Sequence, residues 1–270
     1  MIGVIQNINT TFLALLAGIF TWLMTAIGSS FVFISKKFNQ KMFDTMLGFA
    51  AGVMIAASFW SLLNPAIEMS ENLEYLAWFP AGFGFFLGTL LMRFADKILP
   101  HLHLGYPDSE AEGIKTNLNH TMLLIFAITL HNIPEGLAVG VAIGAISFGL
   151  PEATLAGALG LALGIGIQNM PEGFAVSISM RRDGTSRMKS FMYGQLSAVV
   201  EPIFSVIGAI GVMLAKPLLP YSMGFAAGAM TFVVIEELIP ESQKNNNIHL
   251  STAGTIAGFL VMMILDVAFS

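Results

Sequence analysis

Eight apolar stretches, each long enough to cross a lipid bilayer, follow one another along this 270-residue chain. A bilayer core of about 30 Å requires roughly 20 mostly apolar residues in a helix. The stretches are continuously apolar, whereas the strands of a transmembrane β-barrel alternate apolar and polar residues. We therefore predict an all-α integral membrane protein, a bundle of eight transmembrane helices that forms one domain over residues 1–270. The predicted spans are residues 9–34, 42–63, 74–95, 120–146, 151–181, 190–214, 218–238 and 250–269.

The charge content supports this fold class and excludes several functions. The chain has 12 basic and 17 acidic residues, where a soluble chain of this length would carry roughly 68 charged residues. The absence of cysteine excludes disulfides, thiolate metal ligands and a cysteine nucleophile. A net charge of −5 and the lack of a basic block argue against nucleic-acid binding. The first 35 residues hold no Lys or Arg, so we interpret the first apolar stretch as a retained span rather than a signal peptide.

The basic residues predict an orientation in the membrane. With eight spans, 11 of the 12 basic residues fall in or beside loops on one side, and the twelfth, Lys216, falls on the other. Positive charge favours the cytoplasmic side. We therefore expect both termini outside the cytoplasm, and in a bacterium we expect the protein in the inner membrane.

The longest predicted loop, residues 96–119, should be cytoplasmic. It contains His101 and His103 in a His-x-His pattern, together with acidic residues. Two interpretations stay open for this loop, a loose metal-capturing role and an ordinary solvated polar loop.

The most distinctive pattern lies in spans four and five, where one polar motif occurs twice. Span four reads His-Asn-Ile-Pro-Glu-Gly from His131, and span five reads Gln-Asn-Met-Pro-Glu-Gly from Gln168. The two copies align over nine residues at a separation of 37. Because ionisable side chains inside a span are costly and are functional candidates, the repeat indicates one functional element present twice.

Helix geometry brings the polar side chains of each copy together, because residues three and four apart share a face. His131 and Glu135 point the same way, as do Gln168 and Glu172. Two such faces, if opposed, gather one imidazole, two carboxylates and three amides inside the membrane, and span six adds Glu201. The candidate metal ligands are His131, Asn132, Glu135, Gln168, Asn169, Glu172 and Glu201.

These residue types indicate a divalent metal ion. The carboxylates of Glu135, Glu172 and Glu201 have no intramembrane Lys or Arg partner, so they are either protonated or hold a cation. Carboxylates alone favour Mg or Ca, whereas an added imidazole favours Zn, Fe, Mn or Co. For any single residue the alternative is structural, namely an interhelical hydrogen bond or a protonated packing residue. The duplicated cluster favours the metal site.

These motifs make the chain resemble the ZIP family of metal transporters (Zrt/Irt-like proteins), in particular its bacterial GufA-like branch. The match also includes Glu-Pro from Glu201 and Glu-Glu-Leu-Ile-Pro-Glu from Glu236, and it covers nearly the whole chain. The resemblance implies a transporter that carries zinc into the cytoplasm, often with iron, manganese or cadmium. It also implies that spans 1–3 and 6–8 form an inverted repeat around spans 4 and 5, an arrangement that commonly places the substrate near the midplane.

The resemblance implies two neighbouring metal sites and a transport pathway. The first site would use His131, Glu135, Gln168 and Glu172. The second would use Asn132, Asn169 and Glu201, with Glu135 and Glu172 bridging the two. Met54 and Ser61 match pathway positions, with Glu68 near the outer entrance. Positions towards the cytoplasmic exit match Glu236, Glu237 and Asp266.

Two positions depart from the family pattern. Some relatives have Asp where Asn169 stands, so this chain lacks one carboxylate of the second site, and that site is weakened. Some relatives have His where Glu236 stands, which changes the ligand preference at the exit.

We therefore predict a metal transporter and not an enzyme, with Zn²⁺ as the ion, no prosthetic group, and Cd²⁺, Fe²⁺, Mn²⁺ and Co²⁺ as further candidates. The predicted partners are divalent metal ions and the lipid bilayer, and a homodimer is left open. An intramembrane zinc-dependent hydrolase is the alternative, although the chain has no His-Glu-x-x-His. A proton-coupled carrier of organic cations is a third hypothesis, which the lack of an evident aromatic cage disfavours.

Overall fold

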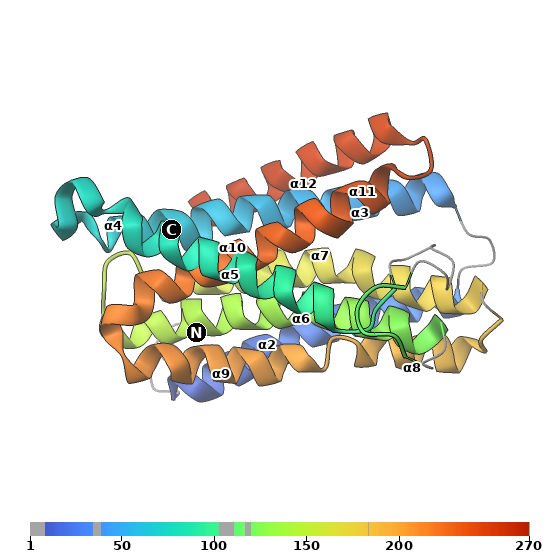
Figure 1. Ribbon diagram of the computed structural model, residues 1–270, viewed down its shortest axis with the longest axis horizontal. Coiled ribbons are helices and arrows are strands. Elements are labelled where there is room, and N and C mark those ends of the chain that lie inside the picture. Colours follow the sequence, from blue (N-terminus) through green and yellow to red (C-terminus); the bar gives the residue numbers. More distant parts are fainter. Residues whose placement is uncertain (1–8, 35–38, 103–110, 117–119, 183, 270) are drawn as a thin grey trace.

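The computed structural model describes residues 9–34, 39–102, 111–116, 120–182 and 184–269, and within them the regular elements are helices (Figure 1). The long helices run back and forth between two ends of the molecule. They are α2 (Thr10–Ser30), α3 (Gln40–Ala56), α5 (Trp78–Ile98), α6 (His120–Ala145), α7 (Leu155–Arg182), α8 (Arg187–Leu196), α9 (Val200–Leu214), α10 (Leu219–Val233) and α12 (Ile248–Phe269). Shorter helical segments are η1 (Phe31–Phe33), η2 (Ala57–Leu63), α4 (Asn64–Glu68), η3 (Glu71–Leu76), η5 (Ile146–Phe148), η6 (Lys216–Leu218), η7 (Val234–Leu238) and α11 (Ile239–Gln243).

Seven helical segments of the described residues are long and apolar enough to cross a membrane, which confirms the prediction of an all-α integral membrane protein. They correspond to predicted spans one to four and six to eight. Helix α7 has 28 residues, ample length for span five, but it is not among the seven. Its mid-helix Gln168, Asn169 and Glu172 lower its hydropathy, so the exact count of eight spans stays a prediction.

Most basic residues of the described chain gather at one end of the molecule. This end holds the first turns of α3, α6, α8 and α12 and the last turns of α5 and α7 (right-hand side of Figure 1). We call it the basic end; the other end, which holds α4, η5 and η6, is the opposite end. Lys216 lies at the opposite end, while Lys36 and Lys37 lie outside the described residues.

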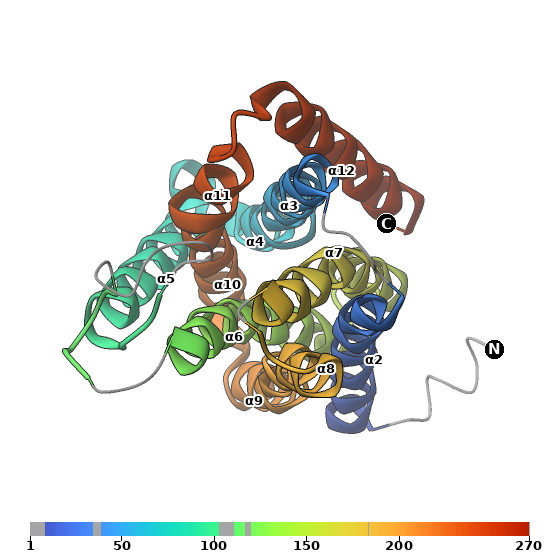
Figure 2. The same ribbon diagram turned by 90° about the vertical axis from the view of Figure 1, so that its right-hand side faces the viewer.

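The helices divide into two groups when the molecule is viewed along its length (Figure 2). One group contains α2, α6, α7, α8 and α9, and the other contains α3, α5, α10 and α12. The main packing pairs are α3 with α12, α5 with α10, α6 with α9 and α2 with α7. In terms of spans, these pairs are two with eight, three with seven, four with six and one with five. If span one is exchanged with six, two with seven, three with eight and four with five, the first two pairs exchange places, and so do the last two. This is the pairing that an inverted repeat predicts.

Glycines allow these pairs to approach closely. A Cβ atom placed on Gly52 of α3 would overlap the carbonyl oxygen of Thr255 in α12, and one on Gly88 of α5 would overlap that of Phe225 in α10. The glycines of α6 do the same against α9, where Gly136 faces the backbone of Glu201. Small residues in membrane helices favour such contacts, and this contact brings Glu201 next to the polar turn of α6.

Three spans contain breaks that hydropathy alone does not reveal. Spans two and seven each contain a π-helical segment, η2 and η7, followed by a short α-helix with a proline, Pro65 or Pro240, in its first turn. Span six contains a break as well, because residues 197–199 form a turn between α8 and α9. Pro202 has no N–H to donate to the carbonyl of Ala198, which explains the break.

Candidate metal centre

The two copies of the polar motif lie in the middle of α6 and α7. Helix α6 carries His131 and Glu135, and α7 carries Gln168 and Glu172. All four side chains are buried, with exposed fractions between 0% and 7%. Glu135 lies within electrostatic range of Glu172 and has Gln168 nearby. The structure therefore brings together the four residues expected at the first site.

Several buried oxygen atoms in this cluster accept no hydrogen bond from the described residues. They are both carboxyl oxygens of Glu135, Oε1 of Gln168 and Oδ1 of Asn132. A buried polar atom without a partner costs about 1–3 kcal/mol, and such atoms call for an explanation such as an ion. Amide oxygens and ionised carboxylate oxygens accept but do not donate hydrogen bonds, so a cation is one species that would satisfy all of them together.

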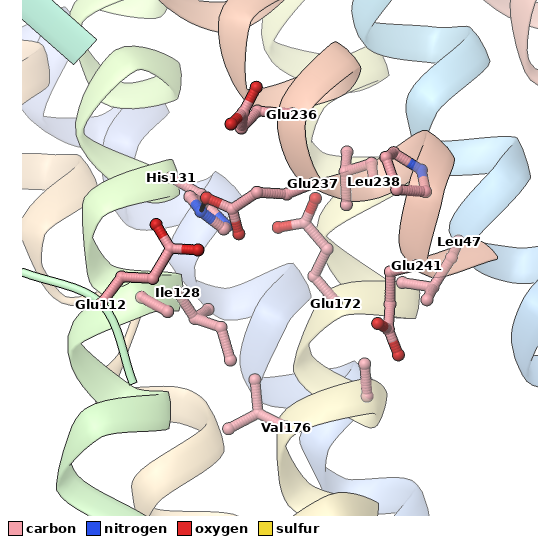
Figure 3. A pocket seen from close by; sticks show the side chains of 13 residues that line it. Leu47, Glu112, Ile128, His131, Glu172, Val176, Glu236, Glu237, Leu238 and Glu241 are labelled. Carbon is pink, nitrogen blue, oxygen red and sulfur yellow. Dashed lines mark hydrogen bonds and ion pairs between the residues drawn. The ribbon is translucent and has the colours of Figure 1, made fainter. Parts of the chain in front are cut away.

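A pocket of about 450 Å³ connects this cluster to the basic end (Figure 3). His131 and Glu172 form its inner part, and carboxylates follow towards its mouth. His131 pairs through Nε2 with Glu237 of η7. A carboxylate on one ring nitrogen fixes the orientation of the imidazole and leaves the other nitrogen for a metal. The other acidic lining residues are Glu112, Glu236 and Glu241.

The residues expected at the second site are buried, but hydrogen bonds already engage them. Nδ2 of Asn169 donates to both carboxyl oxygens of Glu201 at 2.9 Å. Nδ2 of Asn132 donates to the carbonyl oxygen of Ser197 at 3.1 Å, a carbonyl in the turn between α8 and α9. Gln168 donates to Oδ1 of Asn169 at 2.6 Å. The cluster therefore has two parts: oxygen atoms without hydrogen-bond partners around Glu135, and a hydrogen-bonded network around Glu201.

A second pocket, of about 320 Å³, opens at the opposite end of the molecule. It is lined by η2 and α4 and by the end of α12, and it contains Ser61, Asn64, Glu68, Glu152 and Asp266. Two hydrogen bonds order its polar groups: Ser61 donates to Asp266 at 2.5 Å, and Asn64 donates to Glu68 at 2.7 Å.

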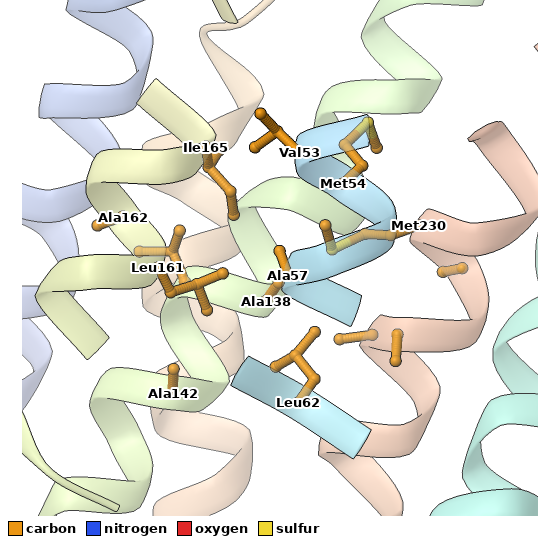
Figure 4. Packing of buried hydrophobic residues seen from close by; sticks show 14 of the residues in the cluster. Val53, Met54, Ala57, Leu62, Ala138, Ala142, Leu161, Ala162, Ile165 and Met230 are labelled. Atoms are coloured by element: carbon orange, nitrogen blue, oxygen red, sulfur yellow. The ribbon is translucent and has the colours of Figure 1, made fainter. Parts of the chain in front are cut away.

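An apolar layer lies between the two pockets, and Figure 4 shows the packing of its side chains. Four spans contribute residues to both pockets. On each of them, a fully buried apolar residue stands along the chain between the residues that line one pocket and those that line the other. These residues are Met54 on α3, Ala138 on α6, Ile165 on α7 and Met230 on α10. In this conformation His131 and Glu172 are therefore reached from the basic end and not from the opposite end.

The expected pathway residues fall at different depths. Met54 belongs to the apolar layer, Ser61 and Glu68 line the pocket at the opposite end, and Glu236 and Glu237 line the pocket at the basic end. The expectation that Asp266 lies with Glu236 and Glu237 was wrong. Helix α12 starts at the basic end, and its length carries Asp266, near its C-terminus, to the opposite pocket.

Other functional candidates were not among the predicted pathway residues. Glu241 of α11 ends the motif that begins at Glu236, lies one helical turn after Glu237 of η7 and lines the same pocket. The spacing of four residues from Glu237 could have placed it in the pathway, because such residues share a face. Arg93 forms an ion pair of 3.4 Å with Glu236, a contact between spans three and seven that no local pattern shows.

Part of the predicted loop 96–119 forms a small cluster at the basic end. Ligand atoms of Asp96, His101 and Glu112 lie within 4.8 Å of one another, and His101 pairs with Asp96 at 3.0 Å. Burial alone would lower the pKa of His101, but the hydrogen bonds to Asp96 and to the carbonyl of Leu99 outweigh it and raise that pKa to about 9. His103 lies outside the described residues.

Comparison with known proteins identifies the family of this chain. The model of the ZIP zinc transporter family matches residues 11–121 and 103–266. The chain belongs to the ZIP zinc transporter family. It is 40% identical to zinc transporter ZIP11 of Homo sapiens over 97% of this chain and 99% of that protein. It is 34% identical to zinc transporter GufA of Myxococcus xanthus, over 94% and 98%, and 37% identical to zinc transporter ZIPB of Bordetella bronchiseptica, over 94% and 81%.

Membership of the ZIP family confirms the resemblance seen in the sequence, including that to GufA. The family and these relatives are named as transporters. The chain is thus assigned to transport rather than to an enzymatic reaction, and the hydrolase alternative has no support.

Proposed function

We propose that this ZIP protein carries zinc ions into the cytoplasm through a site formed by His131, Glu135, Gln168 and Glu172. The observation that carries the proposal is the group of buried, unpartnered oxygens on Glu135 and Gln168 beside the imidazole of His131. The names of the family and of its relatives support zinc as the transported ion.

The charges of this site match a divalent ion. Glu135 and Glu172 together supply two negative charges, which equal the charge of one Zn²⁺. Within the described residues neither carboxylate forms an ion pair with a lysine or arginine. A buried charge needs such compensation. The imidazole of His131 favours zinc over magnesium or calcium, whereas Cd²⁺, Fe²⁺, Mn²⁺ and Co²⁺ share much of this ligand preference and are the competing substrates to test.

The orientation follows from the basic end, which we assign to the cytoplasm because basic residues favour that side. The termini then lie outside, and we expect the inner membrane if the source is bacterial. Zinc would enter past Glu68 and Asp266, lose water to the site, and leave past Glu237 and Glu241. The described conformation is open on the exit side.

Zinc uptake into proteoliposomes tests the proposal. We expect His131→Ala and Glu172→Ala to abolish uptake while the protein keeps its folded state, checked by size-exclusion chromatography and thermal melting. Met188→Ala, an exposed position away from both pockets, is the control for handling and should transport normally. Uptake at the wild-type rate by both ligand variants would contradict the site.

A further inference from the structure

Glu201 is the third carboxylate of the membrane interior, and its surroundings differ from those of the other two. Its side chain is fully buried, and both of its oxygens accept from Nδ2 of Asn169 at 2.9 Å. Neither oxygen of Glu135, in contrast, has a partner with the distance and angle of a hydrogen bond among the described residues, although the side chains of Gln168 and Asn169 lie nearby. One carboxylate is thus open to an ion, and the other is occupied by an amide.

A neighbouring side chain fixes the orientation of the Asn169 amide. Gln168 donates a hydrogen bond to Oδ1 of Asn169 at 2.6 Å. Nδ2 of Asn169 faces Glu201 and also lies 3.4 Å from the carbonyl oxygen of Thr21. If the Asn169 amide were rotated by 180°, its Oδ1 would face the two carboxyl oxygens of Glu201, which are also acceptors. Its Nδ2 would then face the amide nitrogen of Gln168, which is also a donor. The oxygen of Asn169, its only metal-binding atom, is therefore directed away from Glu201.

Charge counting leads to the same arrangement. The three expected ligand carboxylates, Glu135, Glu172 and Glu201, supply three negative charges, so two divalent ions held by them would leave one positive charge that these ligands do not compensate. Glu237, a further carboxylate nearby, is paired with the imidazole of His131. Burying a charge without compensation is costly. One ion held by Glu135 and Glu172 leaves only Glu201, whose oxygens Asn169 already solvates.

We propose that Asn169 takes the place of a second cation, so that this transporter holds one divalent ion in its polar cluster and Glu201 is not a ligand. The inference rests on the proposed function, because it presumes the ion at His131, Glu135, Gln168 and Glu172. Asn169 acts as a positioning residue that sets the number of ions bound. Replacing it with Asp gives four carboxylates, whose charge matches two divalent ions.

Metal stoichiometry tests this inference. Purified full-length protein in lipid nanodiscs is dialysed against Zn²⁺, and bound zinc is measured by atomic emission. Each variant is measured with and without the additional substitution Glu135→Gln. The number of zinc ions lost when Glu135→Gln is added is taken as the number of ions bound in the polar cluster, because zinc bound elsewhere is present in both measurements. We expect one cluster ion in the wild type, one in Glu201→Gln and two in Asn169→Asp.

The outcomes separate the two claims. Two cluster ions in the wild type, loss of the ion in Glu201→Gln, or a single ion in folded Asn169→Asp would overturn the inference and leave the proposed transport site intact. If Glu135→Gln removes no zinc from the wild type, the proposed site itself is wrong and the inference falls with it. Should Asn169→Asp fail to fold, the wild-type and Glu201→Gln counts still decide, because the inference requires one ion in both.

Discussion

The two pockets at the ends of the bundle are lined by similar backbone elements, but only one of them extends to the proposed metal ligands. Each is lined by a π-helical segment that a proline-containing turn follows, η2 with α4 at the opposite end and η7 with α11 at the basic end. The basic-end pocket contains His131 and Glu172, whereas the opposite pocket ends at the apolar layer.

This difference shows that the route is set by side chains in the middle of the molecule rather than by the form of its ends. π-Helical segments occur frequently at functional sites, and here an inverted repeat would supply one for each end. The apolar layer decides which end is connected to the proposed metal site. Transport then requires the layer to open on one side and the site to close on the other, as an inverted repeat allows.

The strongest test of this comparison uses one carboxylate from each pocket. We expect Glu172→Gln, which removes a proposed ligand, to lower zinc uptake by at least about 100-fold, more than the loss typical of residues that only support a ligand. Glu68→Gln, in the opposite pocket, should change uptake by no more than about threefold, since an entrance charge mainly steers the ion. Initial rates at several zinc concentrations measure both. Equal losses in the two variants would remove the distinction between the pockets.

A second comparison uses the hydrogen-bonded acids. Glu237→Gln should weaken zinc binding by roughly 10–100-fold, because Glu237 orients the His131 imidazole. Asp266→Asn keeps an acceptor for Ser61 and should leave the affinity nearly unchanged. Zinc titration by calorimetry on each purified variant checks this, and a larger effect at Asp266 would place the tighter site at the opposite end.

The apolar layer should contribute to stability as well as to closure. Met230 is fully buried, so Met230→Ala is expected to destabilise the protein by about 2–5 kcal/mol. Met188 is 60% exposed, and Met188→Ala should stay within about 0.5 kcal/mol of the wild type. Thermal melting in detergent compares them. Similar melting temperatures for the two variants would show that Met230 is loosely packed.

The natural absence of cysteine allows a direct test of closure. A single thiol at Glu236→Cys should react with an impermeant maleimide from the basic side only, and one at Thr154→Cys from the other side only. Ala138→Cys, within the layer, should be unreactive from either side. Labelling of Ala138→Cys from the side that reaches Thr154→Cys would mean that the layer is open.

The smallest expected effect concerns pH at the basic end. The pKa of His101 is about 9 in the folded protein against 6.5 for the free side chain, so its pairing with Asp96 stabilises the fold fully below about pH 6.5. That contribution should decline as the pH rises and be lost above about pH 9. His101→Gln should remove this part of the pH dependence of the melting temperature, whereas His249→Gln, at an exposed position, should retain it. An unchanged profile in His101→Gln would exclude the pair as its source.

The sequence predicts the chemistry of this protein better than its geometry. The duplicated motif locates the four proposed ligands of α6 and α7, because helix periodicity is local and the motif is short. The contact between His131 and Glu237 joins residues 106 positions apart, and no local pattern predicts it. The break before Glu201 and the π-helical segments depend on prolines and packing together, so hydropathy gives only continuous spans there.

The orientation of single amides is also beyond the sequence. Asn132 and Asn169 occupy equivalent motif positions, yet Asn132 donates to a backbone carbonyl and Asn169 to a carboxylate. The neighbour that each amide meets belongs to α9 or to the turn before it, and the motif does not specify that partner. The position of Asp266 shows the same limit, since its role depends on which end of α12 it occupies.

The most direct test of the account is zinc uptake by two complementary histidine variants. The chain has 5 histidines, so one variant keeps only His131 with the other four changed to Gln, and the other changes only His131. Both are reconstituted in proteoliposomes at matched density after folding is verified. We expect uptake by the variant that keeps only His131 and none by the variant that lacks it. Uptake by the variant lacking His131, with none by the other, would place the essential histidine outside the proposed site and contradict the account.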